Sequence, residues 1–192
     1  MKTLVIALKI FMMFTVLTGI IYPLVVTGIA QVIFPEKANG SLIMQDERII
    51  GSELIGQQFD SAIYFTSRPS AVSYNPLPSG GSNLGTTSQK LKQQVSDRKQ
   101  KFIEFNGLDI NTDIPAEILF ASASGLDPHI SVQAALLQVD RIAKARNFED
   151  VQKQKLLDLV KENTETPQFL CLGQERINVL KLNLDLDNII RN

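Results

Sequence analysis

The sequence contains one cysteine, one histidine and no tryptophan among its 192 residues. Cys171 has no second cysteine, so an intrachain disulfide is excluded, and a zinc site of the usual His/Cys type lacks ligands. The chain also contains no GxxxxGK[ST] loop, no GxGxxG turn and no HExxH pair. These absences disfavour independent ATP hydrolysis, because the lysine and hydroxyl of a phosphate loop are missing.

The amino-terminal part has almost no charge. Residues 10–35 form an uncharged run of 26 residues, and a helix needs about 20 apolar residues to cross a bilayer. Lys2 and Lys9 precede this run, and positive residues favour the cytoplasmic side. We therefore expect residues 1–9 inside, a transmembrane helix over 10–34, a linker over 35–40 and an extracytoplasmic domain over 41–192.

A cleaved signal peptide is the alternative interpretation of this segment, because small residues at Gly28 and Ala30 resemble a cleavage site. The uncharged run is longer than the core of a usual signal peptide, and it continues through Val32 and Phe34. The sequence therefore favours a retained anchor. A single helix does not enclose a polar path through lipid, so we expect an anchored domain or a subunit of a larger complex.

Charge in the remaining chain is balanced with a slight acidic excess. All 20 acidic residues lie beyond residue 35 with 17 basic ones, which makes the net charge of residues 36–192 −3. No basic cluster is evident, so nucleic acid is not an expected partner.

The spacing of apolar residues predicts an α+β domain, with a small sheet partly covered by helices. Short strands are expected within residues 41–59 and at 63–65, and further strands at 169–172 and 177–187, where leucines alternate with polar residues. Helical spacing predicts helices over 91–105, 132–147 and 149–162, and residues 114–120 are a helical turn or a strand. Ser88 or Thr87 and Ser131 are expected as helix caps, and Gly107 as a helix stop.

Two loops between these elements carry the candidate contact residues. Residues 67–88 are rich in Pro, Gly, Ser and Asn over a length that is uncommon for a structureless loop, and residues 122–131 read SASGLDPHIS. We expect the first loop to be ordered, with backbone N–H groups available to an anion or a partner. The candidates for partner or nucleotide contact are Arg68, Tyr74, Asn75, Ser79, Gly80, Gly81, Ser82, Asn83, Asp127, His129 and Ser131.

The second loop superficially resembles a hydrolase triad, with Asp127, His129 and Ser131 close together. Residues so near in sequence do not readily place the histidine between its two partners in space. The structural alternative is a turn shaped by Asp127 and Pro128, in which Ser131 caps the next helix. We therefore predict no catalytic residue in this chain.

Several long motifs resemble those of one known family. The segments GSELIGQQF, YFTSRPSAVSYNPLPSGGSNLG, SASGLDPHIS and INVLKLNLDLD follow an amino-terminal span in that order. This arrangement is similar to the C subunit family of Kdp-type potassium-transporting ATPases, and the resemblance covers nearly the whole chain.

The resemblance implies a non-catalytic subunit of an ATP-driven potassium translocase in a bacterial inner membrane. The implied partners are a potassium-channel-like subunit, a P-type ATPase subunit, a small single-span subunit and the lipid bilayer. The resemblance also implies that the C subunit is a catalytic chaperone, which stabilises the assembly and raises the affinity of the ATPase subunit for ATP. ATP is therefore the implied shared ligand.

The expected topology separates the outer domain from ATP, which lies in the cytoplasm together with the phosphorylation chemistry of such a pump. We therefore expect this domain to act through subunit packing or at the potassium entrance, where a mildly acidic domain gathers cations. A membrane-anchored small-molecule-binding domain and a stand-alone extracytoplasmic hydrolase are the alternative functions.

Overall fold

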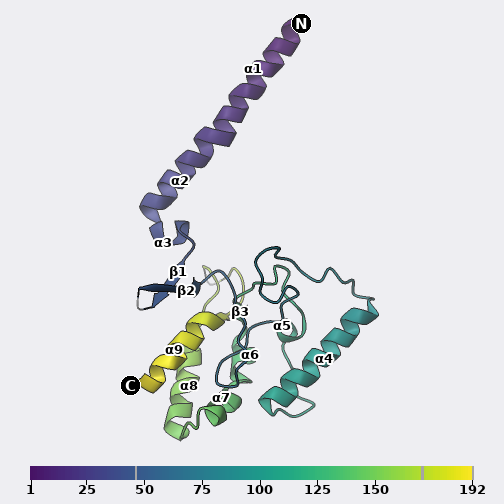
Figure 1. The fold of residues 1–192 in the computed structure, drawn as a ribbon, viewed down its shortest axis with the longest axis vertical. Coiled ribbons are helices and arrows are strands. Elements are labelled where there is room, and N and C mark those ends of the chain that lie inside the picture. Colours follow the sequence, from purple (N-terminus) through teal and green to yellow (C-terminus); the bar gives the residue numbers. More distant parts are fainter. Residues whose placement is uncertain (46, 170, 192) are drawn as a thin grey trace. The chain divides into compact units, whose positions relative to one another are not determined.

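A computed structural model describes residues 1–45, 47–169 and 171–191 of the chain. They form two compact units, Met1–Ser52 and Glu53–Asn192. The mixture of helices and small sheets in Figure 1 confirms the expected α+β class.

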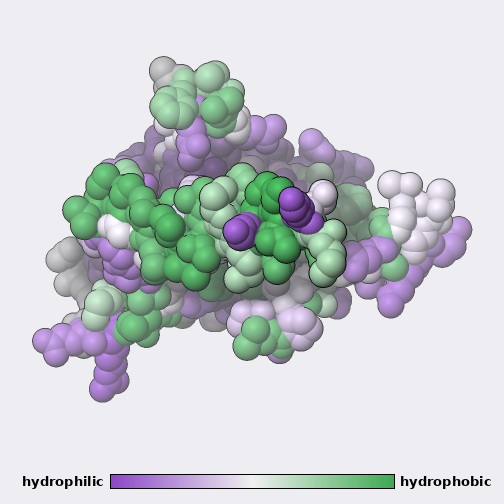
Figure 2. Space-filling view, turned by 90° about the horizontal axis from the view of Figure 1, so that it is seen from above, coloured by the Kyte–Doolittle hydropathy of each residue, from purple (hydrophilic) through white to green (hydrophobic). Residues whose placement is uncertain are grey.

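The first unit begins with a long apolar helix. Its parts are α1 (Lys2–Val16), a π-helical turn η1 (Leu17–Ile21) and α2 (Tyr22–Ile33). Together they make the one helix in the described residues that is long and apolar enough to cross a membrane. In Figure 2 hydrophobic residues make up most of the helix surface that faces the reader. The π turn ends two residues before Pro23. The missing N–H of Pro23 leaves a carbonyl without its usual donor, and such turns are a known response to an interrupted bond ladder.

A short helix and a hairpin complete this unit. The single-turn helix α3 (Pro35–Ala38) lies within the predicted linker, and β1 (Leu42–Gln45) pairs antiparallel with β2 (Arg48–Ser52). The Ser52 hydroxyl donates to the carbonyl of Gly40 at 2.6 Å, which closes the base of the hairpin. The two strands confirm the sequence-based expectation for this part of the chain.

The second unit is built mainly of helices around one core. Figure 1 shows α4 on one flank, with α8 and α9 side by side on the other. The helices are α4 (Gln89–Asn106), α5 (Ala116–Leu119), α6 (Val132–Leu136), α7 (Val139–Ala145), α8 (Asp150–Glu162) and α9 (Val179–Arg191). The largest fully buried apolar side chains of this core are Phe65, Ile130, Ile142, Leu156, Val160, Ile177, Val179, Leu182 and Leu186.

A three-stranded antiparallel sheet lies within the second unit. The strand order is β3 (His129–Ile130), β5 (Arg176–Asn178) and β4 (Thr164–Glu165). In its register His129 lies opposite Asn178, and Ile130 and Thr164 both lie opposite Ile177. The sheet therefore joins the loop at residues 122–131 to the core.

The capping and stop residues in the sequence correctly predicted several helix ends. The Ser88 hydroxyl accepts from the N–H of Leu91, and Gly107 ends α4 with a φ of 63°. Ser131 caps α6 in the same way, although the predicted helix over 132–147 is interrupted at residues 137–138 and forms α6 and α7. The helix predicted from Glu149 begins with a capping box between Glu149 and Gln152.

The strand prediction over residues 177–187 is wrong beyond Asn178, where helix α9 begins. Leu182 and Leu186 share its buried face because they are four residues apart, so the alternation of leucines was coincidental. The strand expected at 63–65 is also absent, and within the segment 41–59, where short strands were expected, no strand lies beyond Ser52. At 169–172 the structure has a turn closed by an isolated bridge between Gln168 and Leu172, while Leu170 lies outside the described residues.

Candidate functional site

The two candidate loops pack against each other. The N–H of Ser122 donates to the carbonyl of Pro69 at 3.2 Å, and the N–H of Gly80 donates to the carbonyl of Ser124 at 2.9 Å. Segments more than 40 residues apart in sequence are thereby joined through their backbones. The glycine-rich part of the first loop and the SASGLDPHIS loop form one surface, which we call the loop junction (residues 67–83 and 122–131).

Glycine is required where the loops approach most closely. A Cβ on Gly125 would lie 2.5 Å from Cγ2 of Val72 and 2.9 Å from the carbonyl oxygen of Gly80, and the φ of Gly125 is +72°. A Cβ on Gly81 would lie 3.1 Å from the carbonyl oxygen of Ala123. The loop junction is therefore tightly packed, and its glycines serve contact between the loops.

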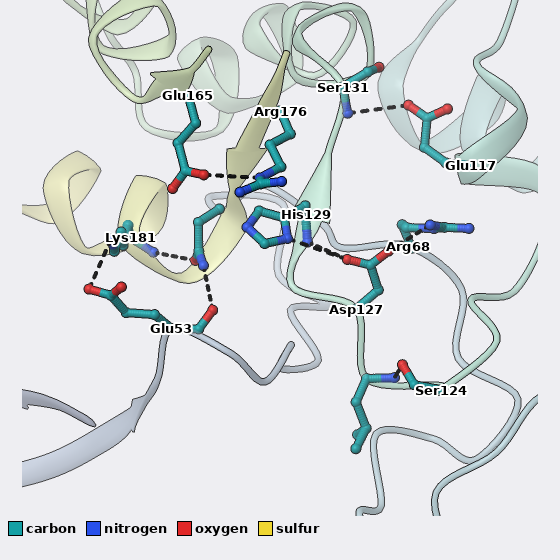
Figure 3. Close-up of polar contacts among 12 residues, drawn as sticks. Glu53, Arg68, Glu117, Ser124, Asp127, His129, Ser131, Glu165, Arg176 and Lys181 are labelled. Atoms are coloured by element: carbon teal, nitrogen blue, oxygen red, sulfur yellow. Dashed lines mark hydrogen bonds and ion pairs between the residues drawn. The ribbon is translucent and has the colours of Figure 1, made fainter. Parts of the chain in front are cut away.

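Asp127 lies at the centre of the junction, between Arg68 and His129, as Figure 3 shows. Its Oδ2 is 2.6 Å from Nη1 of Arg68. Its Oδ1 accepts the backbone N–H of His129 at 2.9 Å and lies 3.6 Å from Nδ1 of the same residue. Burial raises the pKa of Asp127, but hydrogen bonds from His129 and the charge of Arg68 outweigh burial and bring the pKa down to about 2. Asp127 is therefore an anion throughout the physiological pH range.

Tyr74 stabilises the conformation of the first loop. Its hydroxyl donates to the carbonyl of Arg68, and its backbone N–H donates to Oγ of Ser70 at 2.9 Å. Burial raises the pKa of the Tyr74 phenol, so it remains a neutral donor. Tyr74 also has a φ of 58°, a conformation that these bonds stabilise.

Asn75, Asn83 and Ser131 have local structural roles. Asn75 accepts the N–H of Leu77 within its own turn at 3.0 Å, and Asn83 has a left-handed backbone with a φ of 52°. Ser131 accepts the N–H of Ala134 at 3.1 Å as the cap of α6. The turn interpretation of Asp127, His129 and Ser131 is therefore confirmed as geometry, and a contact role for these residues stays a prediction.

A polar clamp beside the junction was missed by sequence reasoning. Residues 62–66 run along α7 and α9 without strand partners, and helix side chains bond their backbone. Asn183 Oδ1 accepts the N–H of Phe65 at 2.8 Å, and its amide donates to the carbonyl of Phe65 at 2.9 Å. Gln138 Oε1 accepts the N–H of Thr66 at 2.7 Å. The sequence did contain a signal for these contacts, namely a polar residue at a position that the helical spacing of apolar residues places on the buried face.

Arg141 completes this clamp. It is buried, and it donates to the carbonyls of Ala62 and Tyr64 and to side-chain oxygens of Asn106 and Gln138. Its guanidinium also lies over the ring of Phe105, 4.5 Å from the centroid. Burial lowers the pKa of Arg141 to about 10, and it remains a cation at neutral pH. The segment that leads to Arg68 is thus fixed before it reaches the junction.

Several polar groups of the loop junction are already engaged within the protein. The N–H groups of Gly80, Gly125 and His129 are donated within the protein, and the Arg68 cation is already paired with Asp127. No cluster of three metal-ligating side chains occurs in the part of the chain that the structure describes. The junction can present a rigid polar surface to a partner, and these three N–H groups and the Arg68 cation are not available to the phosphates of ATP.

The sequence matches a known family along almost its whole length. A family profile described as "KdpC: K+-transporting ATPase, c chain" matches residues 4–188. The chain belongs to the KdpC family. Similar proteins named "Potassium-transporting ATPase KdpC subunit" occur in diverse bacteria. The KdpC subunit of Geotalea uraniireducens is 47% identical over 195 aligned positions, which cover 100% of both chains.

Two further KdpC relatives extend this comparison. The subunit of Burkholderia ambifaria is 49% identical over 191 residues and 97% of each chain. That of Mycobacterium tuberculosis strain H37Rv is 44% identical over 185 residues, or 95% of this chain and 96% of the relative. The family expected from the sequence motifs is confirmed.

Proposed function

We propose that this protein is the C subunit of an ATP-driven, high-affinity potassium uptake complex, in which it stabilises the assembly. The observation that carries the proposal is the family match over residues 4–188 together with full-length relatives that are named as subunits of potassium-transporting ATPases. The proposed partners are a potassium-channel-like subunit, a P-type ATPase subunit and a small single-span subunit.

The chain is proposed to cross the bacterial inner membrane once, with its amino terminus in the cytoplasm. The apolar helix Lys2–Ile33 supports a single span, and the position of Lys2 and Lys9 at its start supports this orientation. Residues beyond the hairpin then form an extracytoplasmic domain.

The subunit is also proposed to raise the ATP affinity of the ATPase subunit through subunit contacts. The engaged N–H groups and the paired Arg68 at the loop junction support an indirect effect, because an effector can change the affinity of a distant site by its differential contacts with two states.

Titration of ATP with and without this chain tests the proposed effect. The potassium-stimulated ATP hydrolysis of the other subunits is measured in detergent, and the apparent KM for ATP is expected to rise about tenfold when the chain is omitted. Adding back the wild-type chain restores the lower value. An unchanged KM in its absence contradicts the chaperone role.

A further inference from the structure

The β1–β2 hairpin carries an exposed apolar face. Successive side chains alternate between the two faces of a strand, so Leu42 and Met44 share one face of β1, and Ile49 lies opposite Met44 on β2. Their exposed fractions are 49%, 62% and 61%. We call this surface the hairpin face (Leu42, Met44 and Ile49). Apolar side chains that gather on one exposed face, instead of being scattered singly, indicate a surface that something covers.

A covering surface would also stabilise the hairpin itself. The strands β1 and β2 form a sheet of their own, without a third strand among the described residues. A hairpin of two strands is only marginally stable in water unless one of its faces packs against further apolar groups. The hairpin face is the exposed apolar side of this sheet and is therefore the side available for such packing.

Hydrogen bonds connect the base of the hairpin to the end of the apolar helix. The side-chain amide of Gln31, in the last turn of α2, donates to Oδ1 of Asn39 at 3.3 Å, and the amide of Asn39 donates to the carbonyl of Pro35 at 2.8 Å. The next residue, Gly40, accepts the hydroxyl of Ser52 at the base of the hairpin. Helix, linker and hairpin belong to one compact unit, and Figure 1 shows β1 and β2 next to α3. The hairpin therefore begins beside the last turn of α2.

The length of the helix places this last turn at a boundary of the bilayer. Lys9 is the last charged residue before the apolar run, and about 20 helical residues cross the hydrocarbon. Counted from Lys9, Gln31 therefore comes close to the opposite boundary, where water and lipid headgroups begin. The polar amides of Gln31 and Asn39 lie where such groups find water. The hairpin begins at the same level.

The apolar surface nearest to the hairpin face is lipid. Helix α2 has no buried residue, so its apolar side chains are open to the acyl chains that surround a membrane helix. The hairpin face continues this lipid-facing surface beyond the end of the helix. Lipid can therefore cover the hairpin face without any further partner.

Backbone groups and charges keep the hairpin at the level of the headgroups. In the described residues each of its strands has one edge without a strand partner, and unpaired backbone groups find donors and acceptors in the headgroup layer but not in hydrocarbon. Glu36 and Lys37 in the linker and Glu47 and Arg48 at the turn are exposed, and they also require water.

We propose that the hairpin face rests on the bilayer beside the apolar helix, with Leu42, Met44 and Ile49 directed into the boundary between headgroups and acyl chains. Amphipathic helices in this boundary bury their apolar face by about 5–10 Å, and we expect the same depth for the hairpin face. The proposal rests on the proposed membrane span. It adds a second lipid contact, which fixes the height at which the chain leaves the membrane.

A single tryptophan tests this contact, because the chain contains none. Full-length Met44→Trp and Ile49→Trp are reconstituted into vesicles of phosphatidylglycerol and phosphatidylcholine whose acyl chains carry bromine near the headgroup. Bromine quenches a tryptophan that it touches, so both variants should lose most of the emission that they show in unbrominated vesicles. Gln45→Trp, on the opposite face of β1, is the matched control and should keep its emission. Val26→Trp, exposed on α2, is the reference for the span and should be quenched.

A second arm measures the same contact in the assembled complex. Cys171, the single cysteine of the chain, is replaced by serine, and Met44→Cys or Gln45→Cys then provides one position for an environment-sensitive dye. The chain is labelled before it is combined with the other subunits, so the dye is confined to this chain. In vesicles whose lipids carry a nitroxide near the headgroup, the dye should be quenched in Met44→Cys and should remain bright in Gln45→Cys.

The outcomes separate this proposal from the ones on which it rests. Quenching of Val26→Trp without quenching of Met44→Trp and Ile49→Trp overturns the hairpin contact and leaves the span in place. Equal quenching of Met44→Trp and Gln45→Trp also overturns it, because the two faces would then not differ. Loss of the Met44→Cys quenching on assembly shows that another subunit covers the hairpin face, and this too overturns the proposal. Absence of quenching in Val26→Trp overturns the span and the hairpin contact together, whereas co-purification tests membership of the complex independently.

Discussion

Asp127 joins the first loop to the start of β3 through one carboxylate. One oxygen meets the Arg68 guanidinium from the first loop, and the other accepts the N–H of His129 at the start of β3. The residue is only partly exposed, so these interactions are less screened than those of a surface ion pair. At the scale of single residues, Asp127 connects the loop junction to the sheet.

The pKa of Asp127 predicts an acid-sensitive domain. The pKa of Asp127 in the folded protein is about 2, below the ordinary value of 3.8. The stabilisation of the folded state by ionised Asp127 is therefore fully present above about pH 4 and is lost as the pH falls toward 2. The free energy of unfolding contributed by this group is about 2 kcal/mol. Asp127→Asn should lower the stability of the full chain in detergent at pH 7 by about this amount and should flatten its decline between pH 4 and 2.

Chemical unfolding followed by circular dichroism at several pH values measures this effect. Asp140→Asn is the control, because Asp140 is exposed where it pairs with Lys153. Equal pH profiles of stability for the wild type and Asp127→Asn would refute the lowered pKa of Asp127 in the folded protein.

Arg141 is predicted to be the more sensitive position. Arg141→Leu leaves the carbonyls of Ala62 and Tyr64 and the Oδ1 of Asn106 without their donors. The expected loss is about 3 to 5 kcal/mol in the free energy of unfolding, as for a buried polar network deprived of one member. Lys144→Leu on the exposed side of the same helix should change it by less than about 0.5 kcal/mol. Comparable losses in the two variants would argue against the clamp.

At the scale of elements, the loop junction depends on close backbone approach. Gly125→Ala places a methyl group against Val72 and the carbonyl of Gly80 at a positive φ, and should cost about 1 to 3 kcal/mol. Gly85→Ala is a matched control in the same loop region, because a Cβ there meets no atom within 4 Å. Limited proteolysis of residues 67–88 should accelerate in the first variant alone. Resistance of that segment in Gly125→Ala would show that the loops do not depend on this contact.

Some elements could be predicted from the sequence and others could not, depending on how local the contacts are that fix them. The ends of α4 are set by Ser88 and Gly107, whose effects act within a single turn and are visible in the sequence. Helix α9 was predicted as a strand because Asn183 was placed on the exposed face, whereas it is buried and bonds both backbone groups of Phe65. That contact joins residues 118 positions apart, so local periodicity did not reveal it.

The contacts of the candidate site also join residues that are distant in sequence, so the residues could be selected from the sequence but their pairing could not. Arg68 and Asp127 were both selected from their loops, but their pairing spans 59 residues and required the fold. The polar clamp went unrecognised because Gln138 and Arg141 serve a backbone segment that has no strand partner, and their acceptors are distant in sequence.

At the scale of the whole molecule, the amino-terminal charge predicts the orientation of the chain. Protease added to intact spheroplasts should remove the domain beyond residue 52 and leave a fragment that contains the apolar helix. A carboxy-terminal tag reports the loss of the domain, and a cytoplasmic marker protein reports that the membrane is intact. Survival of the domain until the membrane is broken would reverse the proposed topology.

Membership of a potassium-transporting complex is tested most directly by purification in mild detergent through a tag on this chain. Polytopic subunits with potassium-stimulated ATPase activity are expected to elute with it at a constant ratio through size-exclusion chromatography. Elution of the chain alone, while those subunits form an intact and active assembly without it, would contradict its membership of the complex.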